Sequence, residues 1–196
     1  MQRFSLFISF LILSLCSMAQ PDTDSLRRVM QSNRPYEQQI NAAIQLVESY
    51  HLKNFDSTII VGDKALQMAR KKADSSSVAK LKHQIGVASY FSGKYDVAAK
   101  NFIESISIFE KNDDKKKLAP VYNDLAKLYR KTKDLDKALS NYNKADAIYR
   151  QLNDTAGIAM ILNESGVVFE YRNDYKEAIN RYTSSMRLAE KAGDSL

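Results

Sequence analysis

Apolar residues recur along most of the chain at the three- and four-residue spacing that is typical of amphipathic helices. The clearest stretch places Val121, Leu125, Leu128 and Tyr129 on one helical face. Polar residues 131–134 interrupt this face, and a second apolar stripe follows at Leu135, Ala138, Leu139, Tyr142, Ala145 and Tyr149. The pattern predicts two antiparallel helices of about 17 residues, each roughly 25 Å long, with a short turn between them.

The same pattern returns every forty residues. A shift of forty superimposes small residues on small residues, aromatic residues on aromatic residues and aspartates on aspartates. The aligned sets are Gly86, Ala126 and Gly166; Ala98, Ala138 and Ala178; Phe102, Tyr142 and Tyr182; and Asp74, Asp114, Asp154 and Asp194. We expect the small residues to lie where the two helices of a copy cross, with the aromatic residue filling space against the next copy. Each aspartate is expected to accept from free N–H groups at a helix start.

These positions resemble the tetratricopeptide repeat. The second helix of each copy carries an alanine four residues before its aromatic residue, and Ser105, Ala145 and Ser185 follow three positions later. The resemblance covers residues 79–192 and implies an all-α fold, a right-handed α-solenoid of helix-turn-helix repeats. The period of forty exceeds the family's usual period of about 34. Extended variants such as the repeats of kinesin light chains show a similar lengthening.

The predicted organisation places four repeats behind an N-terminal segment. We expect a signal peptide at 1–19, an N-terminal segment or capping helix at 20–38, a degenerate repeat at 39–72, repeats at 79–112, 119–152 and 159–192, and the truncated start of another at 193–196. Pro120 conflicts with this pattern, because proline costs about 3 kcal/mol in a helix interior. The third repeat therefore either begins its first helix near Lys117 or kinks at Pro120.

Residues 1–19 have the features of an export signal. Arg3 supplies a positive charge, an apolar stretch runs over 4–15, and the small residues Ser17 and Ala19 predict cleavage near Ala19. The alternative is an uncleaved anchor, whereas lipid attachment at Cys16 is disfavoured because Leu15 is bulky. The expected mature chain is periplasmic or extracellular and contains neither a cysteine nor a membrane-spanning segment.

The chain offers few groups for catalysis. Its formal net charge is +6, but the basic residues are spread among 23 acidic ones, so we expect no nucleic-acid binding. His51 and His83 have no Cys, Asp or Glu at a metal-ligand spacing, and no phosphate-binding loop or hydrolase motif occurs. We therefore expect no metal, no cofactor and no enzyme activity. The repeated aromatic residues are expected in the core: Tyr95, Phe102, Tyr129, Tyr142, Phe169, Tyr175 and Tyr182.

The resemblance implies that the first helix of each copy lines a concave surface. The candidate peptide-binding residues on these helices are His83, Val87, Tyr90, Asn123, Lys127, Arg130, Asn163, Val167 and Glu170. Asn123 and Asn163 are equivalent by the forty-residue shift, and a row of amides can bracket the backbone of an extended peptide. The alternative is that both are solvated polar residues. Lys127, Arg130 and Lys131 favour an acidic or C-terminal carboxylate partner.

The sequence therefore predicts a non-catalytic, exported repeat scaffold that binds a protein or an extended peptide in its concave groove. The alternative is the N-terminal sensory module of a membrane histidine kinase or of a transcriptional regulator.

Overall fold

The computed structural model describes residues 22–50 and 53–193, and these residues form nine α-helices and no strand. The helices are α1 (Thr23–Gln31), α2 (Tyr36–Tyr50), α3 (Phe55–Lys71), α4 (Ser75–Phe91), α5 (Tyr95–Lys111), α6 (Lys115–Lys131), α7 (Leu135–Gln151), α8 (Thr155–Tyr171) and α9 (Tyr175–Gly193). The predicted all-α fold is confirmed. The predicted signal segment, His51 and the aspartate at position 194 lie outside the described residues.

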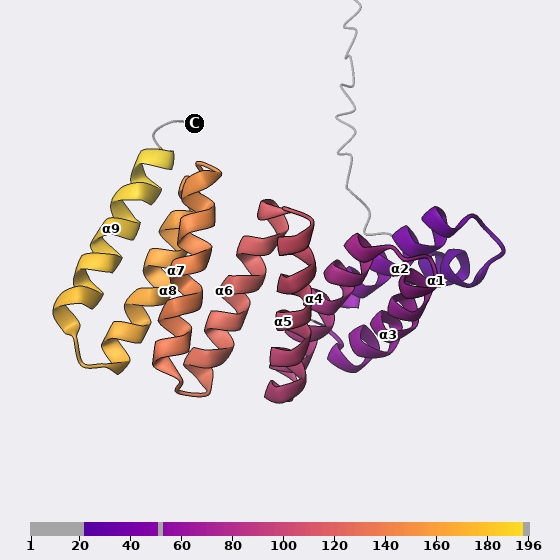
Figure 1. The fold of residues 1–196 in the computed structure, drawn as a ribbon, viewed down its shortest axis with the longest axis horizontal. Helices are drawn as coiled ribbons and strands as arrows, with labels where there is room; N and C mark the ends of the chain where they lie inside the picture. Colours follow the sequence, from indigo (N-terminus) through magenta and orange to yellow (C-terminus); the bar gives the residue numbers. More distant parts are fainter. Residues whose placement is uncertain (1–21, 51–52, 194–196) are drawn as a thin grey trace, which may run out of the picture.

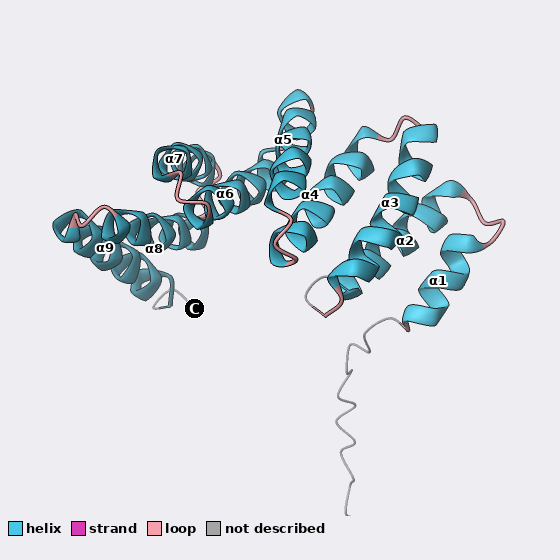
Figure 2. Ribbon diagram, turned by 90° about the horizontal axis from the view of Figure 1, so that it is seen from below, coloured by secondary structure: helices cyan, strands magenta, loops and turns pink. Residues whose placement is uncertain are grey.

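Successive helices pack against one another in chain order, from α1 at one end of the molecule to α9 at the other (Figure 1). The first helices of successive pairs, α2, α4, α6 and α8, also contact one another. Within the described chain, no comparable contacts join α3, α5, α7 and α9. The first helices are therefore closer together and form the concave side, and the row bends and twists along its length (Figure 2).

The recurrent aspartates begin the first helix of three pairs, as expected. Asp74, Asp114 and Asp154 are the N-cap residues of α4, α6 and α8, and each carboxylate accepts from a backbone N–H three residues later. Asp134 caps α7 in the same way. These contacts satisfy N–H groups that the first turn of a helix leaves without partners.

Glycine lets the two helices of a pair approach closely. A Cβ atom on Gly86 would lie 2.7 Å from Phe102, and one on Gly166 would lie 2.5 Å from Tyr182. Both rings come from the second helix of the same pair. Phe102 and Tyr182 therefore pack onto the glycine of their own copy, and Phe102 also lines a pocket with Asp124 and Lys127 of the next copy.

Helix α6 begins at Lys115 and continues through Pro120. The alternative in which this helix begins near Lys117 is therefore wrong. Proline has no N–H, so the carbonyl of Lys116 lacks the donor that an α-helix normally supplies four residues later.

Of the seven aromatic residues expected in the core, two are buried, one is exposed, and Tyr95, Tyr129, Phe169 and Tyr182 are partly buried. Phe102 and Tyr142 are almost fully buried, at 1% and 0% exposure, but Tyr175 is 60% exposed. Its repeat equivalents, Tyr95 and Leu135, are only partly exposed because a following helix pair packs beside them. Tyr175 begins α9, which is the last helix of the described chain, and no described helix follows to cover it.

Replacing Gly86 with alanine should destabilise the fold. The Phe102 ring is buried and cannot withdraw, so overpacking of about 1–3 kcal/mol exceeds the gain of about 1 kcal/mol in helix propensity. Urea unfolding should show a lower free energy of unfolding for Gly86→Ala. Ser107→Ala, at an exposed position of α5, is the control and should change stability little. Equal stability of the two variants would contradict the close-packing account.

Acid should weaken the N-cap of α6. The Lys117 ammonium, hydrogen-bonded to the Asp114 carboxylate, holds the pKa of Asp114 below its ordinary value of 3.8. The stabilisation is therefore fully present above pH 3.8 and is lost as the pH falls through the lower pKa of the folded state. Asp114→Asn keeps an N-cap acceptor without the charge, so its urea midpoint should fall less than that of the unaltered chain between neutral pH and strong acid. An identical fall in both proteins would exclude this contribution.

Candidate functional site

The concave layer of first helices carries three pockets, and most of the candidate binding residues line them. Pocket residues include His83, Val87 and Tyr90 on α4, and Lys127 and Arg130 on α6; α8 contributes Val167. These side chains come from positions forty residues apart in the chain and meet because α4, α6 and α8 pack side by side.

One pocket, which we call the basic pocket, lies at the C-terminal ends of α4, α6 and α8. It has a volume of about 260 Å3 and is lined by Tyr90, Lys127, Arg130, Lys131, Lys133, Val167 and Tyr171. Four of these seven side chains are cationic. Lys133 comes from the turn after α6, where its backbone is left-handed at φ 67°, and its ammonium lies 3.6 Å from the centre of the Tyr171 ring. The pocket therefore combines positive charge with two aromatic walls.

A chain of charged contacts crosses the concave layer. His83 Nε2 on α4 lies 2.8 Å from Asp124 Oδ2 on α6, and Lys127 Nζ lies 3.5 Å from Asp124 Oδ1. Lys127 Nζ is also 4.0 Å from Glu164 Oε1 on α8, and Arg130 Nη2 is 2.9 Å from Glu164 Oε2. These side chains are between 18% and 29% exposed. The contacts hold the cations in place along the groove while leaving them accessible.

The two remaining cations of the basic pocket have no carboxylate to neutralise them. In the described part of the chain, no ion pair involves Lys131 or Lys133. Tyr90, which shares the pocket, is partly buried, and this burial raises its pKa above the ordinary value of 10.0. Its hydroxyl therefore stays protonated and can donate a hydrogen bond. The pocket thus has a surplus of positive charge and a neutral donor.

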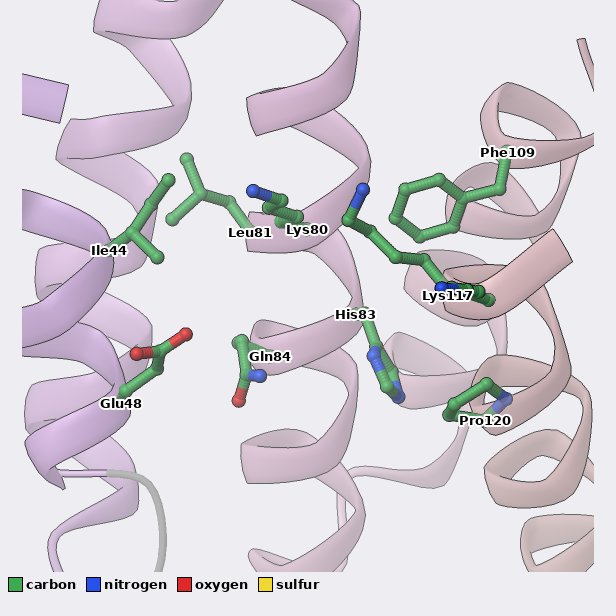
Figure 3. A pocket seen from close by; sticks show the side chains of 10 residues that line it. Ile44, Glu48, Lys80, Leu81, His83, Gln84, Phe109, Lys117 and Pro120 are labelled. Carbon is green, nitrogen blue, oxygen red and sulfur yellow. The ribbon is translucent and has the colours of Figure 1, made fainter. Parts of the chain in front are cut away.

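A second pocket, the lysine-rimmed pocket, lies between α2, α4 and the start of α6 (Figure 3). Its volume is about 270 Å3 and its lining is Ile44, Glu48, Lys80, Leu81, His83, Gln84, Phe109, Lys116, Lys117 and Pro120. Apolar side chains form its walls, and lysines lie at its edge. Glu48 faces Gln84 across the pocket, and the buried Gln84 Oε1 has no hydrogen-bond partner among the described residues.

A small middle pocket separates the other two. It has a volume of about 60 Å3 and is lined by Val87, Tyr90, Phe91, Phe102, Asp124 and Lys127. Tyr90 and Lys127 also line the basic pocket, whereas Asp124 holds His83 of the lysine-rimmed pocket. The three pockets are therefore neighbours along one surface.

Three candidate residues lie outside the pockets. Asn123 is only 3% exposed, and its amide nitrogen contacts Met160 Sδ at 3.9 Å. Asn163 and Glu170 are exposed on α8. The two asparagines are equivalent in register but differ in exposure, so a ligand reaches Asn123 only if the Met160 side chain moves.

Two acidic residues of the site are not among the predicted binding residues. Asp124 and Glu164 hold the basic side chains of the groove in position. Their spacing from basic residues could have predicted these contacts. Asp124 is 41 residues after His83, and Glu164 is 37 residues after Lys127. Opposite charges separated by about one repeat on first helices predict ion pairs between neighbouring repeats.

The described residues contain no cluster of three or more His, Cys, Asp or Glu side chains that could hold a metal ion. Among the same residues, no helix has both the length and the apolar character that crossing a bilayer requires.

A family model matches the C-terminal part of the repeats. Residues 117–191 match the family model described as the tetratricopeptide repeat. No curated protein matches the chain in sequence. The match covers α6–α9 and includes the residues of the basic pocket on α6 and α8.

Solved structures share the fold over a longer part of the chain. BtubC from P. vanneervenii has a TM-score of 0.77 at 20% identity, covering 87% of this chain and 71% of that one. Repeats of a putative kinesin light chain from P. anserina have a TM-score of 0.71 at 13% identity, covering 88% of this chain and 87% of that one. A Rap protein in complex with Competence and Sporulation Factor has a TM-score of 0.62 at 15% identity, covering 89% of this chain and 57% of that one.

At these identities the likeness shows the fold alone. Residues 117–191 match the tetratricopeptide repeat in sequence, and most of the chain shares the helical-repeat fold of these solved structures.

Proposed function

We propose that the chain is a non-catalytic scaffold that binds a protein or an extended peptide in the groove formed by α4, α6 and α8. The observation that carries this proposal is the basic pocket, in which Lys131 and Lys133 lie beside Arg130 without carboxylate partners of their own. Folding alone does not require two lysines without carboxylate partners on the concave side of the helical row. A ligand that brings carboxylates would supply the missing charge.

The chemistry of the pocket favours an acidic segment of the partner. A carboxylate can pair with the guanidinium and ammonium groups, and hydrogen bonds to charged groups contribute about 1.5–3 kcal/mol each. Lys131 and Lys133 are exposed, so water and salt screen their charges, whereas Arg130 is partly buried and its charge is screened less. The rings of Tyr90 and Tyr171 add contact area at a low cost in side-chain entropy.

The fold supports a binding role as well. A Rap protein with this fold has been solved in complex with Competence and Sporulation Factor, which is an instance of a ligand held by such a helical array. This chain spans 57% of the length of that Rap protein, so the comparison supports only the general role of binding a partner. The identity of the partner depends on the residues of this groove.

Reversing charge in the basic pocket should weaken binding. A random dodecapeptide library displayed on phage is selected on the purified chain, and the enriched peptides are expected to contain Asp or Glu. For a fluorescein-labelled peptide of this set, Lys131→Glu should weaken binding about tenfold in fluorescence anisotropy, which corresponds to about 1.4 kcal/mol. Lys64→Glu makes the same charge change on α3, at an exposed residue that lines none of the three pockets, and should leave the affinity unchanged.

Two results would contradict the proposal. The first is that no peptide is enriched over the bare support. The second is that Lys131→Glu and Lys64→Glu weaken binding equally, which would indicate general charge attraction rather than a pocket. Circular dichroism of both variants checks that the helical content is retained.

The cellular location is a second part of the proposal, and it rests on the sequence of the N-terminal segment. An export signal at 1–19 would deliver the scaffold to the periplasm or beyond. Expression of the full gene should therefore yield a product outside the cytoplasm whose N-terminal residue is Gln20, as measured by cell fractionation and intact mass. A cytoplasmic product that retains Arg3 would exclude export without affecting the binding proposal.

A further inference from the structure

We infer that a second copy of this chain covers the outer face of α9, so that two copies pair through antiparallel α9 helices around a two-fold axis. This face lies at the end of the helical row (Figure 1), and α9 contributes no residue to the three concave pockets. The inference is therefore independent of the proposed function. The face, which we call the α9 seam, consists of Tyr175, Ile179, Tyr182, Met186 and Ala189.

The α9 seam is exposed, although the equivalent residues of α5 are covered. Ile179 and Met186 are 63% and 62% exposed. Ile106, at the position of Met186 on α5, is only 8% exposed, and Phe109, at the position of Ala189, is 1% exposed. Helix α6 packs against α5, whereas among the described helices α9 packs only against α8. Large exposed apolar side chains that gather on one face are typical of an interaction site.

The spacing along α9 matches a contact between two helices. The five seam residues follow one another at intervals of four, three, four and three, which is the heptad spacing of helices that pair side by side. From Tyr175 to Ala189 the seam advances by 14 residues, or roughly 21 Å at about 1.5 Å per residue. Helix α8 covers the neighbouring face of α9, where Ala178 is 1% exposed. The seam itself is covered by no described helix.

Charges beside the seam favour a second copy that runs in the antiparallel direction. Lys176 and Glu190 lie on the same flank of the seam, seven residues before and seven residues after Thr183. Both are exposed, and neither belongs to an ion pair within the described residues. In an antiparallel pair centred beside Thr183, Lys176 of each copy lies opposite Glu190 of the partner subunit. A parallel pair would instead place Glu190 opposite the uncharged Ser185.

The same pairing also matches the seam residues by size. A two-fold axis beside Thr183 and Ser184 brings Tyr182 against Met186 of the partner subunit. It also brings Ile179 against Ala189 of the partner subunit, so that a branched side chain meets a small one. Each contact occurs twice, because a two-fold interface uses the same surface of both copies.

The opposite end of the helical row offers no apolar surface that could receive the α9 seam. Among the described residues, none of the large exposed apolar side chains belongs to α1 or α2. Leu26 and Met30, which are apolar residues of α1, are buried in the core that α1 shares with α2. A head-to-tail stack would therefore bury the seam against a polar surface. A two-fold pair buries it against an equal apolar face and closes at two copies.

Association of the full chain should be weak, because a single pair of helices of this length forms a small interface. Sedimentation equilibrium at micromolar to millimolar concentrations should show monomer and dimer and no larger species. Ile179→Glu should weaken dimerisation at least about tenfold, since each copy would bring a charge into the apolar contact. Ile60→Glu makes the same change on α3 at a residue that is 57% exposed, and it should leave dimerisation unchanged.

Reversal of the flanking charges tests the direction of pairing. Lys176→Glu and Glu190→Lys should each weaken dimerisation roughly fivefold, because each variant replaces two attractive contacts with two repulsive ones. The double variant exchanges the two charges and should regain the original affinity. An acidic residue near the start of α9 and a basic residue near its end both favour the helix dipole, so loss of helix does not explain weaker association. Circular dichroism of each variant checks that the helical content is retained.

The remaining outcomes would overturn the inference. A monomer at every concentration, or assembly beyond two copies, would exclude the two-fold dimer. A dimer that Ile179→Glu leaves intact, or that Ile60→Glu weakens equally, would place the contact outside the seam. Single charge variants without effect, or a double variant that stays weak, would exclude the antiparallel pairing. None of these results bears on binding in the concave groove.

Discussion

The close contact between a glycine and an aromatic ring is the constraint on which the rest of the structure depends. Phe102 lies on Gly86, and Tyr182 lies on Gly166, at distances that leave no room for a Cβ atom. This contact brings the second helix of a pair against one side of the first helix. The opposite side of each first helix then faces the concave surface, and consecutive first helices come close enough to share side-chain contacts. The first helices supply most of the pocket linings, and the second helix α5 adds Phe102 and Phe109.

Much of this architecture follows from local chemistry that the sequence displays. The forty-residue period aligns the glycines, the aromatic residues and the capping aspartates, and each of these has a single favourable position in a helix pair. Predicted helices of about 17 residues correspond to six helices, α3–α8, that have 17 residues each. The residues of α4 and α6 that face the groove could also be predicted from the sequence. The residues that are buried against the partner helix define one face of each helix, and the groove residues lie on the other face.

Other features depend on contacts between repeats, which periodicity in one chain does not specify. Tyr175 shares the register of Tyr95 and Leu135 but is exposed, since burial requires a following helix pair as well as the correct position. Asn123 and Asn163 share a register too, yet only Asn123 is covered, by Met160. The roles of Asp124 and Glu164 likewise arise from the neighbour that each one meets on the next first helix. A repeat pattern predicts equivalent positions, and the differences between copies decide the environment and the specificity.

The ion pairs of the groove act more on specificity than on stability. Exposed and partly exposed pairs contribute only about 0–1 kcal/mol each, so Glu164 stabilises the fold little by holding Arg130 and Lys127. In the proposed binding role, Glu164 would hold these side chains in place before a ligand arrives, which would reduce the entropy lost on binding. Glu164 neutralises only part of the positive charge, because Lys131 and Lys133 lie beside it without acidic partners in the described structure. In the proposed binding role, a ligand carboxylate would pair with Lys131 or Lys133 while Glu164 keeps its contacts with Arg130 and Lys127.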